Sequence, residues 1–222
     1  MESEFFVSVM SPIYKLIDAP RLVPAVFWIS LMGVVLFGFS PGSAQQSGFD
    51  YLTVRGNSVK TTHQAKYEIK IDPAFKLLGE LHHRPTYDKK QFNVSFAAFS
   101  DGKYLVMVHA ETHTDGSGGL DYSNLTPGKL NGLTFTSREQ CASAEDETEL
   151  NGNPQIQFIR KTGFNFALPF YLKQYFTSSE DGKAEVVISY GTSLSSCENL
   201  SDGFKSQIER QIQERVSVSA SK

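Results

Sequence analysis

Two pairs of strand-like segments, each joined by an Asp-Gly dipeptide, constrain the fold of this chain more than any other feature. In both pairs, aromatic and β-branched side chains dominate the flanks, as they do in β-strands. Asp-Gly suits the left-handed backbone of a tight reversal, so each pair is expected to form an antiparallel hairpin. The predicted hairpins span residues 91–113, with Asp101-Gly102 at the reversal, and residues 170–190, with Asp181-Gly182 at the reversal.

Shorter segments add strands and a helix to these hairpins. Alternation with period two predicts strands at 51–57 and 66–71, and short strands are also expected at 133–137 and 156–160. Asp72-Pro73 provides a capping side chain followed by a residue suited to the first helical turn. We therefore expect a short helix near residues 73–81.

The last part of the chain has helical periodicity. Apolar residues recur at every fourth position from Leu200 to Val216, and Ser201 or Asp202 can cap the first free amides. This pattern predicts an amphipathic helix that lies across one face of a sheet. Together these elements indicate an α+β domain with a dominant antiparallel sheet of about six to eight strands. A β-barrel-like fold with a terminal helix is the alternative.

An uncharged apolar stretch near the N-terminus indicates export. It runs from Leu22 to Phe39 after two basic residues, and the small residues Gly42 and Ala44 suit a signal peptidase. We expect residues 1–44 to be an export signal that is cleaved after Ala44. Because the stretch approaches the about 20 residues that span a bilayer, residues 22–39 are alternatively a retained membrane anchor.

Residues 45–222 remain after such cleavage, and their length suits a single domain. We expect this domain to be extracytoplasmic: periplasmic or secreted after cleavage, or else anchored to a membrane by residues 22–39. Two acidic residues precede Met10, so translation from Met10 instead of Met1 would give the signal a more ordinary N-terminal region.

Cys141 and Cys197 are the only cysteines of the chain. An even number of cysteines in an exported protein is most simply explained by a disulfide, because the compartment is oxidising. Each cysteine also lies in a polar, loop-like stretch of sequence. We therefore expect a disulfide between Cys141 and Cys197 rather than two buried thiols.

Charge and composition exclude some classes of partner. The formal net charge is −3, and lysine and arginine are scattered singly or in pairs instead of clustered. Proteins that grip phosphate backbones concentrate these cations on one surface, so nucleic acid is not expected as a partner. Contact with a membrane is expected only through the N-terminal apolar stretch.

His109, Glu111 and His113 form the strongest candidate for chemistry. Alternate residues of a strand share a face, so these three side chains lie together if residues 103–113 are extended. Imidazole and carboxylate are zinc donors, and three of them leave one position for an activated water. The spacing differs from the helical HExxH motif, and three polar residues at the solvent-exposed end of a strand are the simpler interpretation. With Asp101-Gly102 setting the register, His109 lies opposite Val94 and Glu111 opposite Phe92.

An aromatic-rich stretch around Pro169 is the second candidate. Phe164, Phe166, Tyr171 and Tyr175 could line a pocket for an apolar ligand. Ordinary packing in the core explains the same residues.

The sequence has no phosphate-binding glycine loop, no GxSxG elbow and no haem-attachment CxxCH. With no catalytic centre or cofactor indicated, we expect a non-catalytic envelope protein that binds a partner protein or a small apolar ligand. A metal-dependent hydrolase that uses His109, Glu111 and His113, with zinc as its cofactor, is one alternative. A structural subunit of an envelope complex, anchored by the N-terminal stretch, is another.

Overall fold

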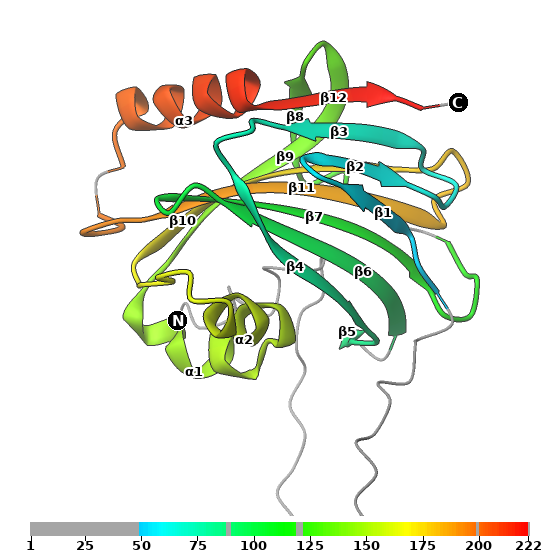
Figure 1. Ribbon diagram of the computed structural model, residues 1–222, viewed down its shortest axis with the longest axis horizontal. Coiled ribbons are helices and arrows are strands. Elements are labelled where there is room, and N and C mark those ends of the chain that lie inside the picture. The colour runs from blue at the N-terminus through cyan, green and yellow to red at the C-terminus, as the bar shows by residue number, and fades with distance from the viewer. Residues whose placement is uncertain (1–48, 88–89, 119–121, 199, 222) are drawn as a thin grey trace, which may run out of the picture.

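The computed structural model describes residues 49–87, 90–118, 122–198 and 200–221. The apolar stretch from Leu22 to Phe39 and the expected cleavage position after Ala44 lie outside these residues. In the described part, the chain forms two antiparallel sheets and three short α-helices (Figure 1). None of these helices has both the length and the apolar character that crossing a membrane requires.

The larger sheet contains both predicted hairpins. Its path is open, because the end strands β4 and β8 pair with β6 and β9 and not with each other. The predicted α+β fold with a dominant antiparallel sheet is therefore confirmed, and the barrel alternative is not. In spatial order the strands are β4 (Lys76–His83), β6 (Lys90–Ser100), β7 (Tyr104–His113), β11 (Ala184–Ser193), β10 (Phe170–Ser178), β9 (Leu133–Ala142) and β8 (Thr126–Leu130), with β5 (Thr86–Tyr87) beside β6.

A second, four-stranded sheet was not predicted. It contains the strands expected at 51–57 and 66–71, together with two strands that the sequence pattern did not indicate. Its members, in spatial order, are β1 (Leu52–Arg55), β2 (Ser58–Thr61), β3 (Tyr67–Ile71) and β12 (Val216–Ala220). Strand β12 joins this sheet by pairing with β3, which brings the C-terminus beside the first strands of the domain.

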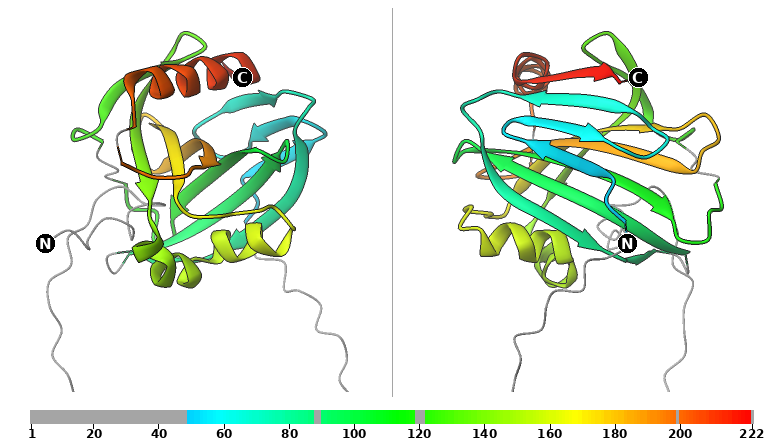
Figure 2. Two further views of the ribbon diagram at one scale, coloured as in Figure 1. Left: turned by 90° about the vertical axis from the view of Figure 1, so that its left-hand side faces the viewer. Right: turned by 45° about the vertical axis from the view of Figure 1, so that its right-hand side comes forward.

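The hydrophobic core lies on both faces of the larger sheet. On one face, Val59 and Ile69 of the small sheet pack with residues such as Ile188 of β11. On the opposite face, the helices α1 and α2 cover Phe96, Leu105 and their neighbours. Figure 2 shows this arrangement from two sides, with the small sheet and the C-terminal helix above the large sheet and α1 and α2 below it.

The predicted C-terminal helix is confirmed as α3 (Asp202–Arg215). The Ser201 hydroxyl accepts a hydrogen bond from the Phe204 amide at 3.1 Å, and Ile208 and Ile212 are buried against the large sheet. The helix ends before Val216, because Val216 pairs with Ile71 as the first residue of β12. Pairing with the small sheet therefore removes the last residue of the predicted apolar stripe from the helix.

The prediction of a short helix near residues 73–81 is wrong. Asp72 does cap, since its carboxylate accepts from the Ala74 amide at 2.7 Å, but the result is a single turn that leads into β4. Strand β4 then pairs along β6, with a bulge between Leu77 and Gly79 where Gly79 has a φ of +147°. Pairing with a strand far along the chain outweighs local helix signals here, because those signals contribute only weakly.

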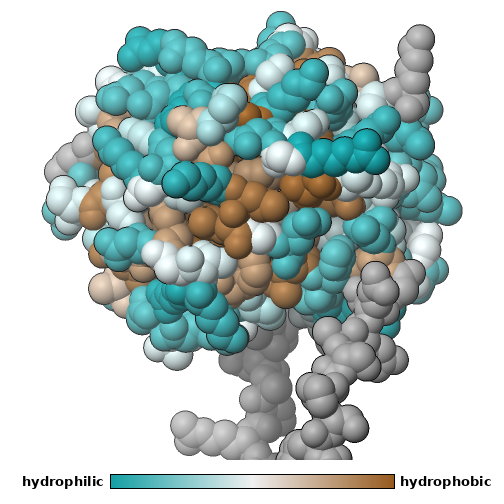
Figure 3. Space-filling view, in the orientation of Figure 1, coloured by the Kyte–Doolittle hydropathy of each residue, from teal (hydrophilic) through white to brown (hydrophobic). Residues whose placement is uncertain are grey.

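Strand β4 also carries an exposed apolar side chain. Leu77 is 41% exposed and is the one exposed large hydrophobic residue among those described. In Figure 3, hydrophobic atoms gather near the middle of the view, where β4 crosses the front of the molecule in Figure 1, and hydrophilic residues surround them.

The strand predicted at 156–160 is a helix. Helix α2 (Pro154–Lys161) begins after Asn153, whose side chain accepts from the Gln155 amide at 2.9 Å, and Pro154 occupies its first turn. Asn followed by Pro is a helix-start signal that the short apolar run obscured. The acidic segment before it forms a 3₁₀ turn (Ala144–Asp146) and α1 (Glu147–Gly152).

The first hairpin is confirmed, but its predicted register is wrong. The Asp101 amide donates to the Tyr104 carbonyl at 3.3 Å, so the two loop residues are Gly102 and Lys103. The Asp101 carboxylate accepts from the Tyr104 amide at 2.7 Å and fixes this turn, with Gly102 at a φ of +92°. As a result, His109 lies opposite Phe96 and Glu111 opposite Val94. The second hairpin is antiparallel as predicted.

The predicted disulfide between Cys141 and Cys197 is present, with the two Cα atoms 5.7 Å apart. It joins the end of β9 to the segment that precedes α3, across a sequence separation of 56 residues. Closing a loop of this size stabilises a fold by about 4 kcal/mol in the chain-entropy model. The bond thus ties the large sheet to the helix that covers it.

Candidate functional site

His109, Glu111 and His113 lie on one face of β7, as the strand alternation predicts. All three are buried, with exposed fractions of 1%, 1% and 4%, and not at a solvent-exposed strand end. Burial lowers the pKa of His109 to about 3 and also lowers the pKa of His113. Both imidazoles are therefore neutral at neutral pH.

The trio is not assembled as a metal site. Within the described ranges, no three His, Cys, Asp or Glu side chains are arranged to hold a metal ion. Each imidazole instead packs edge-on against a phenyl ring of β6: His109 on Phe96 with centroids 4.9 Å apart, and His113 on Phe92 at 4.4 Å. These contacts explain the burial of the two histidines without a ligand.

Glu111 faces a second buried acid that the sequence analysis missed. Glu185 of β11 lies directly opposite Glu111, and both side chains are buried. Burial and the neighbouring Glu185 charge raise the pKa of Glu111 well above its usual value, and burial also raises the pKa of Glu185. The Arg138 guanidinium favours the ionised form of Glu185, so we assign the proton to Glu111 and the negative charge to Glu185.

A tyrosine, Tyr122, lies beside this acidic pair. Its ring lies 5.8 Å from that of Phe176, and the guanidinium carbon of Arg138 is 5.2 Å from the same Phe176 ring. The Tyr122 phenol is near Glu185, and burial raises its pKa far above the usual range. The only signal of Glu185 in the sequence is a single acid inside an otherwise apolar strand, and its partner emerges only from strand pairing.

An open pocket of about 660 Å³ lies at the ends of β7 and β11. Four separate parts of the chain line it: the residues before β1, the loop between β2 and β3, the end of β7, and the turn between β10 and β11. The lining residues are Phe49, Asp50, Tyr51, Thr62, His63, Gln64, Lys66, Thr112, His113, Gly116 and Lys183. Of the predicted site residues, only His113 belongs to this pocket.

Three adjacent rings form the apolar part of the pocket. The Tyr51 centroid lies 5.6 Å from that of Phe49 and 5.3 Å from that of His63. The Tyr51 hydroxyl contacts the Thr112 hydroxyl at 2.9 Å, which fixes the ring between the two sheets. Phe49 and His63 are largely buried, so the half-buried Tyr51 ring presents most of this preformed aromatic surface.

His63, which lines the pocket, contacts the main chain of β11. Its Nε2 donates to the Glu185 carbonyl at 2.9 Å, because a carbonyl oxygen only accepts, and burial lowers the pKa of the ring. His113 makes its contact through Nδ1, which lies 2.8 Å from the Ser117 hydroxyl. Both lining imidazoles are thus neutral and held in place at neutral pH.

The four aromatic residues predicted to bind a ligand do not share a pocket. Phe164 and Phe166 pack with α1 and α2 on one side of the large sheet, whereas Tyr171 and Tyr175 face α3 on the other side. The Tyr171 ring contacts Phe204 of α3 at 5.1 Å. For these residues the core-packing interpretation fits the structure.

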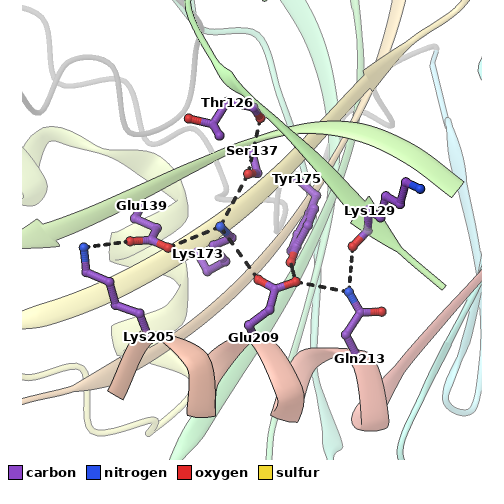
Figure 4. A network of polar contacts seen from close by, with 9 residues as sticks. All are labelled: Thr126, Lys129, Ser137, Glu139, Lys173, Tyr175, Lys205, Glu209 and Gln213. Atoms are coloured by element: carbon purple, nitrogen blue, oxygen red, sulfur yellow. Dashed lines mark hydrogen bonds and ion pairs between the residues drawn. The ribbon is translucent and has the colours of Figure 1, made fainter. Parts of the chain in front are cut away.

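A polar network holds α3 to the large sheet (Figure 4). The Tyr175 hydroxyl donates to Glu209 at 2.5 Å, and the Lys173 ammonium lies between Glu139 at 3.3 Å and Glu209 at 3.8 Å. Gln213 donates to the Lys129 carbonyl at 2.6 Å. Lys205 also pairs with Glu139 at 3.2 Å, so two lysines balance two glutamates, and we assign this network to helix docking and not to a site.

No protein-family model, curated protein or solved structure matches this chain in the comparisons with known proteins.

Proposed function

We propose that this domain is a non-catalytic binding protein that holds a small ligand with a flat apolar part in the pocket beside Tyr51. The observation that carries the proposal is the aromatic surface formed by Phe49, Tyr51 and His63 in an open pocket of about 660 Å³. Small-molecule sites usually measure about 300 to 1,000 Å³ and combine aromatic walls with a few placed polar groups.

The state of the polar side chains supports binding over catalysis. A nucleophile or general base needs a group within hydrogen-bond reach of the reacting atoms and a pKa near the working pH. The two lining imidazoles have pKa values lowered by burial, and the Tyr51 hydroxyl is engaged by Thr112. These groups are suited to orienting a ligand.

The disulfide supports an extracytoplasmic location for this binding role, since such bonds persist in oxidising compartments. We propose that the N-terminal apolar stretch delivers the domain there, as an export signal cleaved after Ala44 or as an anchor formed by residues 22–39. In either case the pocket would be exposed to small molecules outside the cytoplasm.

The proposal is tested by NMR titration of the purified full chain with 1-naphthalenemethanol, a neutral aromatic probe. We expect saturable amide shifts confined to the residues that line the pocket. Gln64→Trp places bulk at an exposed lining position and is expected to weaken binding at least tenfold, because the indole occupies the volume that the probe needs.

Lys60→Trp is the matched control, since Lys60 is also exposed, on β2, but does not line the pocket. It is expected to leave the affinity unchanged. Shifts spread over other surfaces, or equal affinity in wild type and Gln64→Trp, would reject the pocket as the binding site.

A further inference from the structure

Two lysines stand at the edge of the same pocket. Lys66 follows the loop between β2 and β3, and Lys183 ends the turn between β10 and β11, so they approach the pocket from different elements. Both side chains are exposed. Each carries a full positive charge on a flexible stem that can reach an anion in several positions.

Neither lysine forms an ion pair within the described part of the chain, although the Lys183 charge acts on the neighbouring Asp181 carboxylate. The ion pairs found there involve other cations, such as Lys70, Lys173 and Arg160, and none includes Lys66 or Lys183. These two charges are therefore available to a ligand.

The acids around the pocket are already engaged. Asp50, which lines the pocket, accepts from the Leu52 amide at 3.2 Å and lies 3.4 Å from His82 Nε2. Asp115 accepts from the Ser117 amide at 2.8 Å, and Asp181 accepts from the Ser179 hydroxyl at 2.6 Å. The lining thus combines two lysines that form no ion pair with one hydrogen-bonded carboxylate, that of Asp50.

We infer that the ligand is an aromatic or other flat apolar molecule that carries an anionic group, such as an aryl carboxylate. This inference rests on the proposed function and specifies its ligand class. The body of the ligand packs on Phe49, Tyr51 and His63, and its anionic group lies at the mouth of the pocket between Lys66 and Lys183. The neutral imidazoles leave recognition of the charge to the two lysines.

The test compares 1-naphthoate with 1-naphthalenemethanol, which have the same ring system but differ in charge, by titration of the purified full chain. We expect 1-naphthoate to bind roughly three- to tenfold more tightly, as two solvent-exposed charge contacts allow. The doubly substituted Lys66→Gln/Lys183→Gln protein should lose this advantage and bind the neutral probe as before. Raising the salt concentration should also reduce the advantage, because exposed charges are screened.

Lys60→Gln/Lys129→Gln is the matched control, since it removes two exposed lysines that do not line the pocket. It should keep the preference for 1-naphthoate. If both probes bind the pocket equally, or if Lys66→Gln/Lys183→Gln keeps the preference, the inferred ligand class is overturned while the proposed binding function stands. If neither probe binds in the pocket, the proposed function fails, and the inference fails with it.

Discussion

At the scale of single residues, the pairing of Glu111 with Glu185 is the least expected feature of this protein. Two buried carboxyl groups on facing strands cannot both be ionised without a large electrostatic cost. Keeping the proton on Glu111 avoids that cost but makes stability depend on pH. The pair is thus a local weakness in the large sheet.

The pH dependence of unfolding tests this assignment. The raised pKa of Glu111 means that the folded state binds a proton which the unfolded state releases above its own pKa of about 4.3. The free energy of unfolding should therefore fall as pH rises from about 4.3 towards the raised folded pKa. Glu111→Gln keeps the shape without the titration, so it should flatten this slope and stabilise the protein at pH 7 by about 1 to 3 kcal/mol.

Urea unfolding at pH 5, 6, 7 and 8 measures this effect, with Glu214→Gln on the exposed surface of α3 as the control. A slope in Glu111→Gln as steep as in the wild type would show that Glu111 does not carry the proton.

At the scale of elements, α3 depends on both apolar and polar contacts with the sheet. Ile208 and Ile212 supply the apolar contacts, whereas Lys173, Glu139 and Glu209 supply the polar ones shown in Figure 4. The Lys173 side chain is only 11% exposed, so its charge is shielded from water and depends on its partners. We therefore expect the ion pairs of Lys173 to matter more than those at the surface.

Two lysine substitutions separate these cases. Lys173→Met leaves Glu139 and Glu209 without their shielded partner, and we expect a loss of about 1 to 3 kcal/mol in the free energy of unfolding. Lys205 is the other cation that pairs with Glu139, at 3.2 Å, and its side chain is 40% exposed. Lys205→Met should therefore lower the free energy of unfolding by less than about 1 kcal/mol. Denaturant unfolding of both variants decides the matter, and equal losses would contradict the distinction.

At the scale of the whole molecule, three parts of the chain are held on the large sheet. The small sheet and α3 cover one face, α1 and α2 cover part of the other, and the Cys141–Cys197 bond ties β9 to the segment before α3. The pocket opens where the small sheet meets the ends of β7 and β11, so its shape depends on how the two sheets pack.

Removing the disulfide tests how much of this assembly it stabilises. Cys141→Ser/Cys197→Ser should lower the free energy of unfolding by about 2 to 5 kcal/mol, because the unfolded chain regains the freedom of the closed loop. Thermal unfolding of the double variant and of chemically reduced wild type should give similar losses. An unchanged Tm after reduction would show that packing alone fixes α3.

The sequence by itself determined the features that depend on neighbouring residues, and the disulfide, because the chain has only two cysteines. Both hairpins, the capped helix α3 and the Cys141–Cys197 bond follow from turn residues, a fourfold apolar period and cysteine pairing. It also placed His109, Glu111 and His113 on one face, because alternation in a strand is local.

Only the tertiary structure decided the rest. Residues 76–83 form β4 because they pair with β6. Glu111 lies opposite Glu185 because β7 pairs with β11. Tyr51, His63 and Lys183 line one pocket although they come from separate segments of the chain. Such contacts join residues many positions apart, and their energy exceeds the weak local preferences that a sequence pattern records. The acidic pair therefore exists only once β7 and β11 have paired, and the pocket only once the two sheets have packed.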